Sequence, residues 1–497
     1  MSVRARLLSN TAWNLTGQLA PLVVGVLTLP LLIRLVGLER FGFISLVWVL
    51  VGYASIFDFG IGRALIRTVA AHLAVGDKQR AAASAHAALF FLTLFGLALA
   101  ALMAPASSWL VNSALKLPPE LVAEAVPATV LLALSLPFVM LTTGFSGLLS
   151  AHQHFKSLNL IRIALGVAGY LGPVLVALWS NRLDAVVAVV LGLRVLGTLV
   201  HAVVCARQCA WRPWLQLPTA EATRELFRLG GWMAVSNIIG PLLTYLDRLL
   251  LGVLVPMRSV AIYATPYDVV SKSMLIPAAI IATLFPLASG VQRGSPQARS
   301  MLGNSVRVLF VLMLPVIFIF VVLARPGLEL WLGPEIAEQG ATVMQILAVG
   351  LLFNALAQGP AMLIQAAGEP RWMAVLHMVE LPIFIAILWW LTSRYGIVGT
   401  AVAAFLRNAL DAAVVFWLAY SRVTFSPMNW RATLPPAMLA AALLSAAAWP
   451  ESWAQALPVA LAGIGVFAAY AWALLLSPVE RTQLLGLGRS GLGLGPR

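Results

Sequence analysis

Apolar residues run through this chain in fourteen long stretches, separated by short segments where polar and charged residues gather. About 20 apolar residues in a helix are enough to cross the hydrocarbon core of a bilayer. Because backbone groups inside lipid must bond within their own segment, we predict that these stretches are helices. The sequence therefore predicts an all-α polytopic membrane protein with about 14 transmembrane helices, at residues 10–33, 41–62, 82–104, 122–149, 159–179, 184–206, 229–254, 260–290, 303–324, 341–366, 372–393, 396–421, 431–449 and 455–476.

The longest polar segment, residues 207–228, follows the sixth stretch and contains prolines and charged residues. Segments of this composition are typical of domain boundaries. We expect six helices on either side of it and two more at the end. The predicted parts are an N-terminal lobe (1–206), a cytosolic inter-lobe linker (207–228), a C-terminal lobe (229–421), two extra helices (422–476) and a flexible, Gly-rich cytosolic tail (477–497).

Basic residues alternate from one predicted loop to the next. Of the 32 lysines and arginines, 18 lie in the even-numbered loops and at the two ends, and seven lie in the odd-numbered loops. Three more, Arg162, Arg307 and Arg431, lie at the ends of spans that adjoin even-numbered loops. Cytosolic loops of inner-membrane proteins carry such an excess of Lys and Arg. The alternation therefore predicts a multi-pass inner-membrane protein with both termini in the cytosol.

The overall composition supports this class. Charged residues make up 10% of the chain and hydrophobic residues 61%, whereas a soluble protein has about 25% charged residues. The net charge of +14 lies in short loops rather than in a basic domain, which argues against nucleic acid as a partner. The first apolar stretch is too long for a signal peptide and lacks a small-residue cleavage site, so we expect it to be retained.

Charged side chains also lie inside the predicted spans. Because a charge at the bilayer centre costs about 2.5–3.5 kcal/mol, such residues face protein or water rather than lipid. At a rise of about 1.5 Å per residue, four of them lie roughly 14–18 Å into their spans, close to the midplane. These four are Arg194, Lys272, Glu380 and Arg407.

Two interpretations of the intramembrane charges remain open. Asp268 with Lys272, and Arg407 with Asp411, are four residues apart, and Asp247 adjoins Arg248, so these could be structural pairs. Alternatively, the charges line a central wet cavity, in which cations bind an anionic head group. We favour the cavity, with Arg194, Arg248, Lys272 and Arg407 binding the substrate and with Glu380, Asp268 or Asp247 as a coupling or cavity acid.

The chain shows no motif for covalent chemistry. It contains no G-x-x-x-x-G-K-[ST] loop and no large soluble loop that could carry acidic catalytic residues. Cys205 and Cys209 have no ligand histidine pair nearby and are interpreted as packing residues. His152 and His154 share a loop without a carboxylate at ligand spacing, so we place them at a lipid headgroup boundary. We therefore expect no enzyme, no cofactor and no metal.

Several segments, in order along nearly the whole chain, resemble one family of transporters. They are residues 40–67, which contain Asp58-Phe59-Gly60, then Asp247 to Gly252, Ala261 to Tyr263, Leu284 to Ser289, Gly368 to Arg371 and Tyr395 to Gly399. This set resembles the Wzx-type oligosaccharide flippases of the multidrug/oligosaccharidyl-lipid/polysaccharide exporter superfamily.

The resemblance implies two six-helix lobes around a central cavity that opens alternately to the two sides of a bacterial inner membrane. It implies transfer of an undecaprenyl-pyrophosphate-linked oligosaccharide from the cytosolic to the periplasmic leaflet, for O-antigen, capsule or exopolysaccharide. Arg194, Arg248, Lys272 and Arg407 would then meet the pyrophosphate. Membrane lipids and the polysaccharide polymerase machinery would be partners.

Two other members of the superfamily stay open as alternatives. Cation-coupled multidrug extruders have an acidic site on the first helix, where this chain has Asn14 and Gln18 but no carboxylate. Lipid II flippases have fourteen spans and a basic cavity, and the two extra helices do not separate them from this chain. Outside the superfamily, a membrane scaffold needs no midplane charges, and a channel needs rings of like charge.

Overall fold

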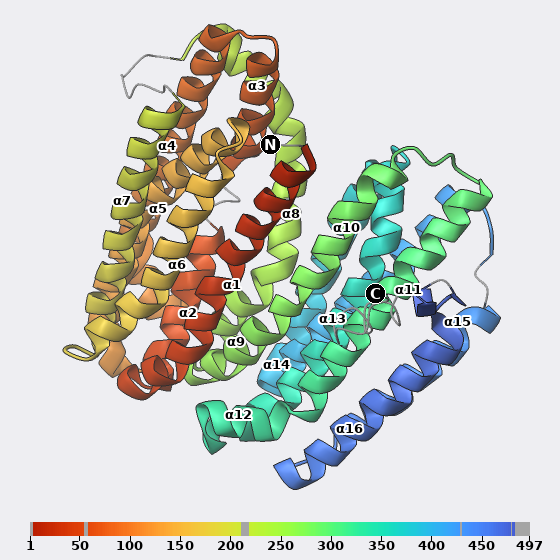
Figure 1. Cartoon of the computed structure of the whole chain (residues 1–497). Helices are drawn as coiled ribbons and strands as arrows, with labels where there is room; N and C mark the ends of the chain where they lie inside the picture. The colour runs from red at the N-terminus through yellow and green to blue at the C-terminus, as the bar shows by residue number, and fades with distance from the viewer. Residues whose placement is uncertain (1–2, 54–57, 210–217, 428–429, 479, 483–497) are drawn as a thin grey trace, which may run out of the picture. The chain divides into compact units, whose positions relative to one another are not determined.

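The computed structural model describes residues 3–53, 58–209, 218–427, 430–478 and 480–482, and within these residues it contains helices and turns but no strand (Figure 1). The α-helices are α1 (Val3–Val36), α2 (Leu38–Tyr53), α3 (Ile61–Ala74), α4 (Lys78–Trp109), α5 (Pro119–Ala151), α6 (Phe155–Ala177), α7 (Leu183–Gln208), α8 (Ala220–Leu254), α9 (Met257–Ser271), α10 (Leu275–Ala288), α11 (Pro296–Val322), α12 (Ala324–Leu332), α13 (Pro334–Ala366), α14 (Pro370–Ala419), α15 (Trp430–Ala447) and α16 (Trp453–Tyr470).

These helices confirm the predicted fold class. Among the described residues, ten segments are long and apolar enough to cross a membrane. The longest, α14, accounts for two predicted spans because Gly396 leaves the helical conformation, with φ 57° and ψ −136°. Only glycine adopts such a backbone conformation without strain. Helices α2, α8 and α15 lie at the positions of the remaining predicted spans.

Two short helices correct the sequence prediction. The span expected at 41–62 is not one helix, because Gly60, with φ 77°, precedes a separate helix, α3, after α2 (Leu38–Tyr53). Residues 63–74 of α3 lie in a predicted loop, yet Leu65 and Val69 are buried while Arg63 is exposed. Helix α12 likewise follows α11 directly, where the sequence indicated a turn. Both helices are too short for a span, so a search for long apolar stretches misses them.

The chain divides into two compact units, and the first consists of residues 1–264 and 392–397. In this unit α5 packs against α4 and α7, α1 packs against α6, and α3 packs against α4, α5 and α8. A Cβ atom on Gly96 of α4 would come within 2.6 Å of the Cα of Pro137 on α5. Glycine at this position therefore allows the two helices to approach closely, as small residues do in membrane bundles.

The second unit consists of residues 265–391 and 398–497. One apolar cluster joins α11 and α13 to α12, α15 and α16. Another joins α10, α11 and α13 to both arms of α14, through Met373 on the first arm and Val415 on the second. The two arms of α14 are thus anchored on the same neighbouring helices, which fixes the position of the polar residues they carry.

The predicted lobe, linker and tail boundaries stay predictions. Residues 210–217 of the predicted linker 207–228 lie outside the described residues, and α8 begins within the linker at Ala220. Residues 479 and 483–497 of the predicted tail also lie outside them.

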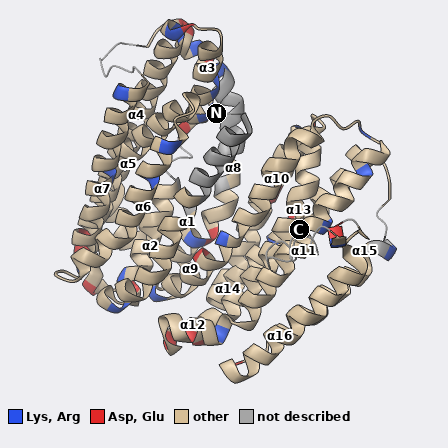
Figure 2. Cartoon of the chain, viewed as in Figure 1, with Lys and Arg blue, Asp and Glu red and all other residues tan. Residues whose placement is uncertain are grey.

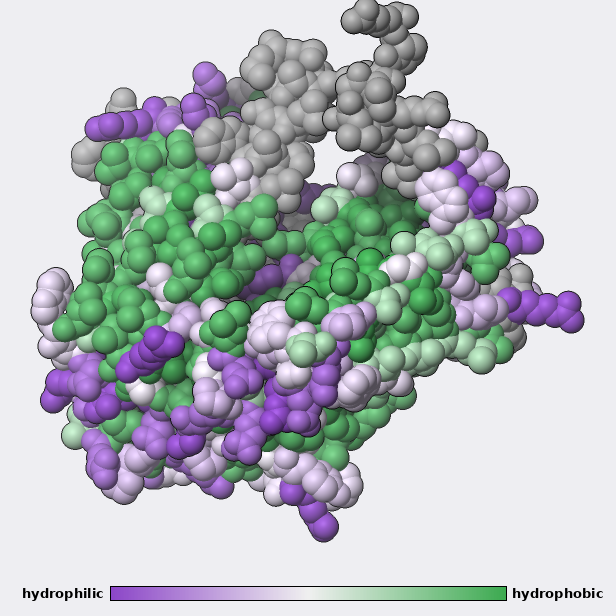
Figure 3. All heavy atoms as spheres, turned by 60° about the horizontal axis from the view of Figure 1, so that its bottom comes forward, coloured by the Kyte–Doolittle hydropathy of each residue, from purple (hydrophilic) through white to green (hydrophobic). Residues whose placement is uncertain are grey.

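The flanks of the helices are strongly apolar. Leu27, Leu102 and Leu461 are 72%, 70% and 74% exposed. Figure 2 shows the charged residues mostly toward the ends of the helices, and Figure 3 shows broad hydrophobic areas with hydrophilic residues gathered beside them. Exposed apolar surface of this extent would be an association surface in a soluble protein, whereas here it is suited to lipid.

Candidate functional site

The two arms of α14 bring four ionisable side chains together in the second unit. His377 and Glu380 lie one turn apart on the first arm, and Arg407 and Asp411 lie one turn apart on the second. Arg407 Nε is 3.6 Å from Glu380 Oε1, and His377 Nε2 is 3.7 Å from Asp411 Oδ1. Both pairs therefore cross between the arms, in addition to the i, i+4 spacing of Arg407 and Asp411 noted in the sequence.

Neighbouring side chains hold Arg407 in position. Its Nη2 donates a hydrogen bond of 2.8 Å to Oδ1 of Asn408, which also accepts one of 3.4 Å from Nδ2 of Asn354 on α13. The guanidinium carbon lies 5.5 Å from the centre of the Phe384 ring, a distance typical of a cation–π contact. Arg407 is thus oriented by α13 and by both arms of α14.

The acidic groups of this network are buried and incompletely bonded. The side chains of Glu380 and Asp411 are 12% and 11% exposed. Within the described part of the chain, Glu380 Oε1 and Asp411 Oδ1 accept no hydrogen bond. A buried acceptor without a donor costs about 1–3 kcal/mol, and more when it is charged. Ligand atoms of His377, Glu380 and Asp411 lie within 4.8 Å of one another, so the group can take up a proton or a small cation.

Arg194 lies on α7 in the first unit and is half-buried. Its backbone carbonyl accepts a hydrogen bond of 2.9 Å from the hydroxyl of Thr198, which also lies 3.0 Å from the hydroxyl of Thr142 on α5. One turn further along α7, His201 Nε2 is 3.4 Å from Ser146 Oγ. A line of polar side chains therefore follows Arg194 along the contact between α5 and α7.

Asp247 and Arg248 are buried in α8, at 3% and 5% exposure. The hydroxyl of Tyr263 on α9 donates a hydrogen bond to Oδ2 of Asp247, and Oδ1 accepts one of 2.8 Å from the backbone N–H of Arg248. The guanidinium of Arg248 lies 5.3 Å from the centre of the Tyr245 ring. Asp247 thus links α8 to α9, which favours the structural interpretation for that residue.

Lys272 begins a short 3-10 turn, Lys272–Met274, between α9 and α10, and its side chain is exposed. Asp268, one turn earlier, is half-buried, and its carbonyl accepts a hydrogen bond of 3.2 Å from the Ser271 hydroxyl. A 3-10 stretch inside a long helical span is a frequent position for bending.

The predicted substrate-binding cations are divided between the units. Arg194 and Arg248 belong to the first unit, and Lys272 and Arg407 belong to the second. The structure brings Arg407 to Glu380 and keeps Asp247 beside Arg248. A shared cavity lined by all four cations stays a prediction.

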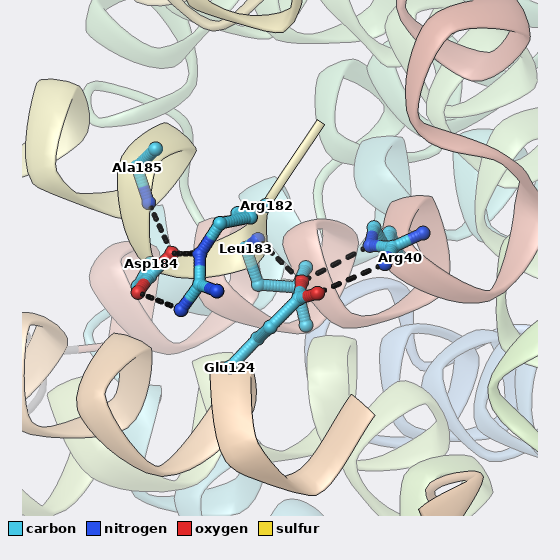
Figure 4. A network of polar contacts seen from close by, with 6 residues as sticks. All are labelled: Arg40, Glu124, Arg182, Leu183, Asp184 and Ala185. Carbon is cyan, nitrogen blue, oxygen red and sulfur yellow. Dashed lines mark hydrogen bonds and ion pairs between the residues drawn. The ribbon is translucent and has the colours of Figure 1, made fainter. Parts of the chain in front are cut away.

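A second polar network ties α2, α5 and the start of α7 together within the first unit (Figure 4). Arg40 donates hydrogen bonds of 3.1 and 2.9 Å to the two carboxylate oxygens of Glu124. The backbone N–H of Leu183 donates a third, of 3.0 Å, to the same carboxylate. Beside it, Arg182 makes two hydrogen bonds, of 3.1 and 2.8 Å, to Asp184. Glu124 therefore joins three helices, whereas the hydrogen bonds of Asp184 in this network are to Arg182 and Ala185, one or two positions away.

We expect Glu124→Gln to destabilise the protein by about 2–3 kcal/mol, because an amide cannot accept from both Arg40 nitrogens and the Leu183 N–H. Asp184→Asn is the matched control. Its partner Arg182 is 56% exposed, so the loss should be under about 1 kcal/mol. Thermal unfolding of the purified variants in detergent measures both losses of stability. Equal melting temperatures for the two variants would contradict this role of Glu124.

The fold and the intramembrane charges define a polytopic helical membrane protein. The structure resembles the lipid II flippase MurJ in an inward closed conformation, with a TM-score of 0.69 and 11% identity, over 93% of this chain and 98% of that one. It also resembles a multidrug resistance MATE family transporter of the MOP superfamily in an inward-facing conformation, with a TM-score of 0.66 and 14% identity, over 84% of this chain and 95% of that one. At these identities the likeness shows a shared fold.

The sequence itself identifies the family. The model of the polysaccharide biosynthesis protein family matches residues 31–339. A protein of Shigella flexneri named for O-antigen transport is 31% identical over 423 residues, which cover 84% of this chain and 98% of the relative. The chain belongs to the polysaccharide biosynthesis protein family, and the resemblance to oligosaccharide flippases found in the sequence is confirmed.

Proposed function

We propose that this protein is a flippase that moves a polyprenyl-pyrophosphate-linked oligosaccharide from the cytosolic to the periplasmic leaflet of a bacterial inner membrane. Membership of the polysaccharide biosynthesis protein family and the Shigella flexneri relative named for O-antigen transport support this function. The fold shared with a lipid II flippase supports transport of a lipid-linked substrate. The relatives reported above are transporters and flippases by name, which supports transport without covalent chemistry.

The observation that carries the proposal is Arg407 held beside Glu380 inside a membrane-spanning helix. Their side chains are 15% and 12% exposed, and the contact of 3.6 Å is an ion pair rather than a short hydrogen bond. A pyrophosphate offers Arg407 two acceptors at hydrogen-bond distance, whereas Glu380 makes one contact of 3.6 Å. Substrate binding would therefore draw Arg407 away from Glu380 and leave Glu380 free to take up a proton or cation.

In this proposal the cations of both units contribute to one binding site. Arg194 and Arg248 would approach the pyrophosphate from the first unit, and Lys272 and Arg407 from the second. The polyprenyl chain would stay in lipid while the two units rock to expose the site alternately to each side. The 3-10 turn at Lys272 and the break at Gly396 are positions where helices could bend during this motion.

The membrane orientation and partners complete the proposal. Alternation of basic residues supports both termini lying in the cytosol. The substrate would be delivered on the cytosolic side and passed to polysaccharide polymerase machinery on the periplasmic side. Two other functions, lipid II flipping and multidrug extrusion, are supported by the shared fold alone.

Depleting the protein in its host bacterium and extracting the lipid-linked intermediates tests the proposal. We expect a polyprenyl-pyrophosphate-linked oligosaccharide repeat unit to accumulate on the cytosolic leaflet, because its synthesis continues while its transfer stops. Accumulation of lipid II would instead support the peptidoglycan function. Increased drug sensitivity with normal lipid intermediates would support the extruder and reject the proposed substrate.

A further inference from the structure

Four residues that the sequence assigned to packing and to a headgroup boundary come together at one end of the first unit. His152 and His154 form the turn between α5 and α6, and Cys205 and Cys209 lie at the end of α7. The Cys209 side chain lies beside Cys205 on one side and His152 on the other, and His154 Nε2 lies 3.2 Å from the carbonyl oxygen of Gln208. The prediction that the thiols have no ligand histidine pair nearby is therefore wrong, because the α5–α6 turn carries His152 and His154 to them.

The two cysteines face the same way. Cys209 caps α7, and its backbone N–H donates a hydrogen bond of 2.9 Å to the carbonyl of Cys205, so their side chains lie on one face of the helix. Cys205 is fully buried, and its thiol donates a weak hydrogen bond of 3.5 Å to the carbonyl of Phe145 on α5. Cys209 is half-buried, so it connects the buried thiol to the surface.

The histidines are oriented by backbone carbonyls. His152 Nδ1 is 3.0 Å from the carbonyl oxygen of Leu148, and a carbonyl only accepts, so Nδ1 carries the proton. Nε2 is then left with its lone pair for the contact with Cys209. Metal-binding histidines commonly have this arrangement, in which the second ring nitrogen donates to a carbonyl. The His154 ring stacks parallel to that of His152, with centroids 6.2 Å apart, and its Nε2 lies 3.2 Å from the Gln208 carbonyl oxygen.

We propose that Cys205, Cys209 and His152 form a binding site for a thiophilic metal ion of the Zn²⁺ class, with His154 or water as the fourth ligand. Thiolate sulfur and imidazole nitrogen are the preferred ligands of Zn²⁺, in tetrahedral geometry. Two ligands four residues apart on one helix face commonly share one ion. Binding releases the thiol protons to solvent and leaves the two thiolates and neutral imidazole bonded to the metal.

Cys209 lies between the other two proposed ligands. Cys205 and His152 each contact Cys209, but the three ligand atoms are not all within 4.8 Å of one another in the described structure. Metal binding therefore requires a small movement of the His152 turn toward the thiols.

A disulfide between the same cysteines is less compatible with the geometry. Residues four apart in a helix have Cβ atoms about 5–6 Å apart, whereas a disulfide requires about 3.5–4.5 Å. The last turn of α7 would have to unwind for the bond to form. A metal ion spans the larger separation without this change, because it lies between the two sulfurs.

Titrating the purified, reduced full-length protein with Co²⁺ tests the site directly. The chain has two cysteines, so any thiolate-to-Co²⁺ charge-transfer absorbance arises from Cys205 and Cys209. We expect absorbance that saturates at about one equivalent and disappears when Zn²⁺ displaces Co²⁺. Cys209→Ser should remove it, and because Cys209 is half-buried, this variant should fold even if Cys205→Ser does not.

The histidines supply the matched pair of variants. His152→Ala should weaken Co²⁺ binding at least about 10-fold. His86→Ala, which removes a half-buried histidine bonded to the Ala82 carbonyl on α4, should leave it unchanged. Absence of a thiolate band in the reduced wild-type protein, or equal affinities for the two variants, would overturn the proposal. Neither result depends on substrate transport, so the test is separate from that of the flippase function.

Discussion

Replacing Arg407 by alanine is expected to reduce surface export of the glycan at least about 100-fold. The substitution removes the cation that would bind the pyrophosphate, and truncating one member of a buried charge pair costs about 2–5 kcal/mol in binding. It also leaves Glu380, 12% exposed, without its ion-pair partner. Quantifying surface glycan in a deletion strain that produces each variant, at matched membrane levels, measures the effect.

Two further variants separate substrate binding from structural support. Arg407→Ala combined with Glu380→Ala removes both charges, so the protein should regain stability while export stays lost. Arg407→Lys keeps the charge but not the bidentate geometry, and should restore export only in part. If the double variant exported at the wild-type rate, Arg407 would serve only to neutralise Glu380, and its proposed role in substrate binding would be wrong.

Arg194→Ala is expected to reduce export about 10- to 100-fold, corresponding to a loss of about 1.4–2.8 kcal/mol in transition-state stabilisation. The Thr198 hydroxyl donates its hydrogen bond to the backbone carbonyl of residue 194, and this carbonyl is still present when the residue is alanine. The variant should therefore insert and melt like the wild type, so that the loss reflects the missing charge. Initial rates of glycan appearance at the surface provide the measurement.

Arg299→Ala is the control for Arg194. Arg299 lies near the start of α11, where its Nη2 donates a hydrogen bond of 3.1 Å to the Gly294 carbonyl. The substitution removes one positive charge without altering a predicted mid-membrane site. Export should be close to normal in this variant. Similar losses for Arg194→Ala and Arg299→Ala would indicate an effect of total charge and would contradict a specific role for Arg194.

The sequence predicts the membrane-spanning helices well because lipid imposes a simple rule on their length and composition. It also places a break next to Gly396, because Arg394 and Tyr395 separate two apolar stretches. It misses α3 and α12, since short helices with one buried face resemble loops in hydropathy. The charge alternation predicts orientation, but it carries no information on which helices are neighbours.

The partners of the charged residues are the part that the sequence does not reveal. Arg407 and Asp411 show an i, i+4 pattern, yet the pairing of Arg407 with Glu380 depends on how the two arms of α14 align after Gly396. Arg40 and Glu124 are 84 residues apart, and nothing local links them. The same holds for His152 and Cys209, which meet because α5, α6 and α7 pack together. Such contacts are set by tertiary packing, to which the residue pattern of a single sequence gives little access.

The most direct test of the account is transport by the purified protein in liposomes of two lipids that differ in their head group. One carries the glycan on polyprenyl pyrophosphate, and the other carries the same glycan on an uncharged linkage. We predict that the wild type moves the pyrophosphate lipid at least about 100-fold faster than the uncharged one, and that Arg407→Ala abolishes this difference. Equal rates for the two lipids with the wild type, or an unchanged preference in Arg407→Ala, would contradict the proposed binding of pyrophosphate by intramembrane cations.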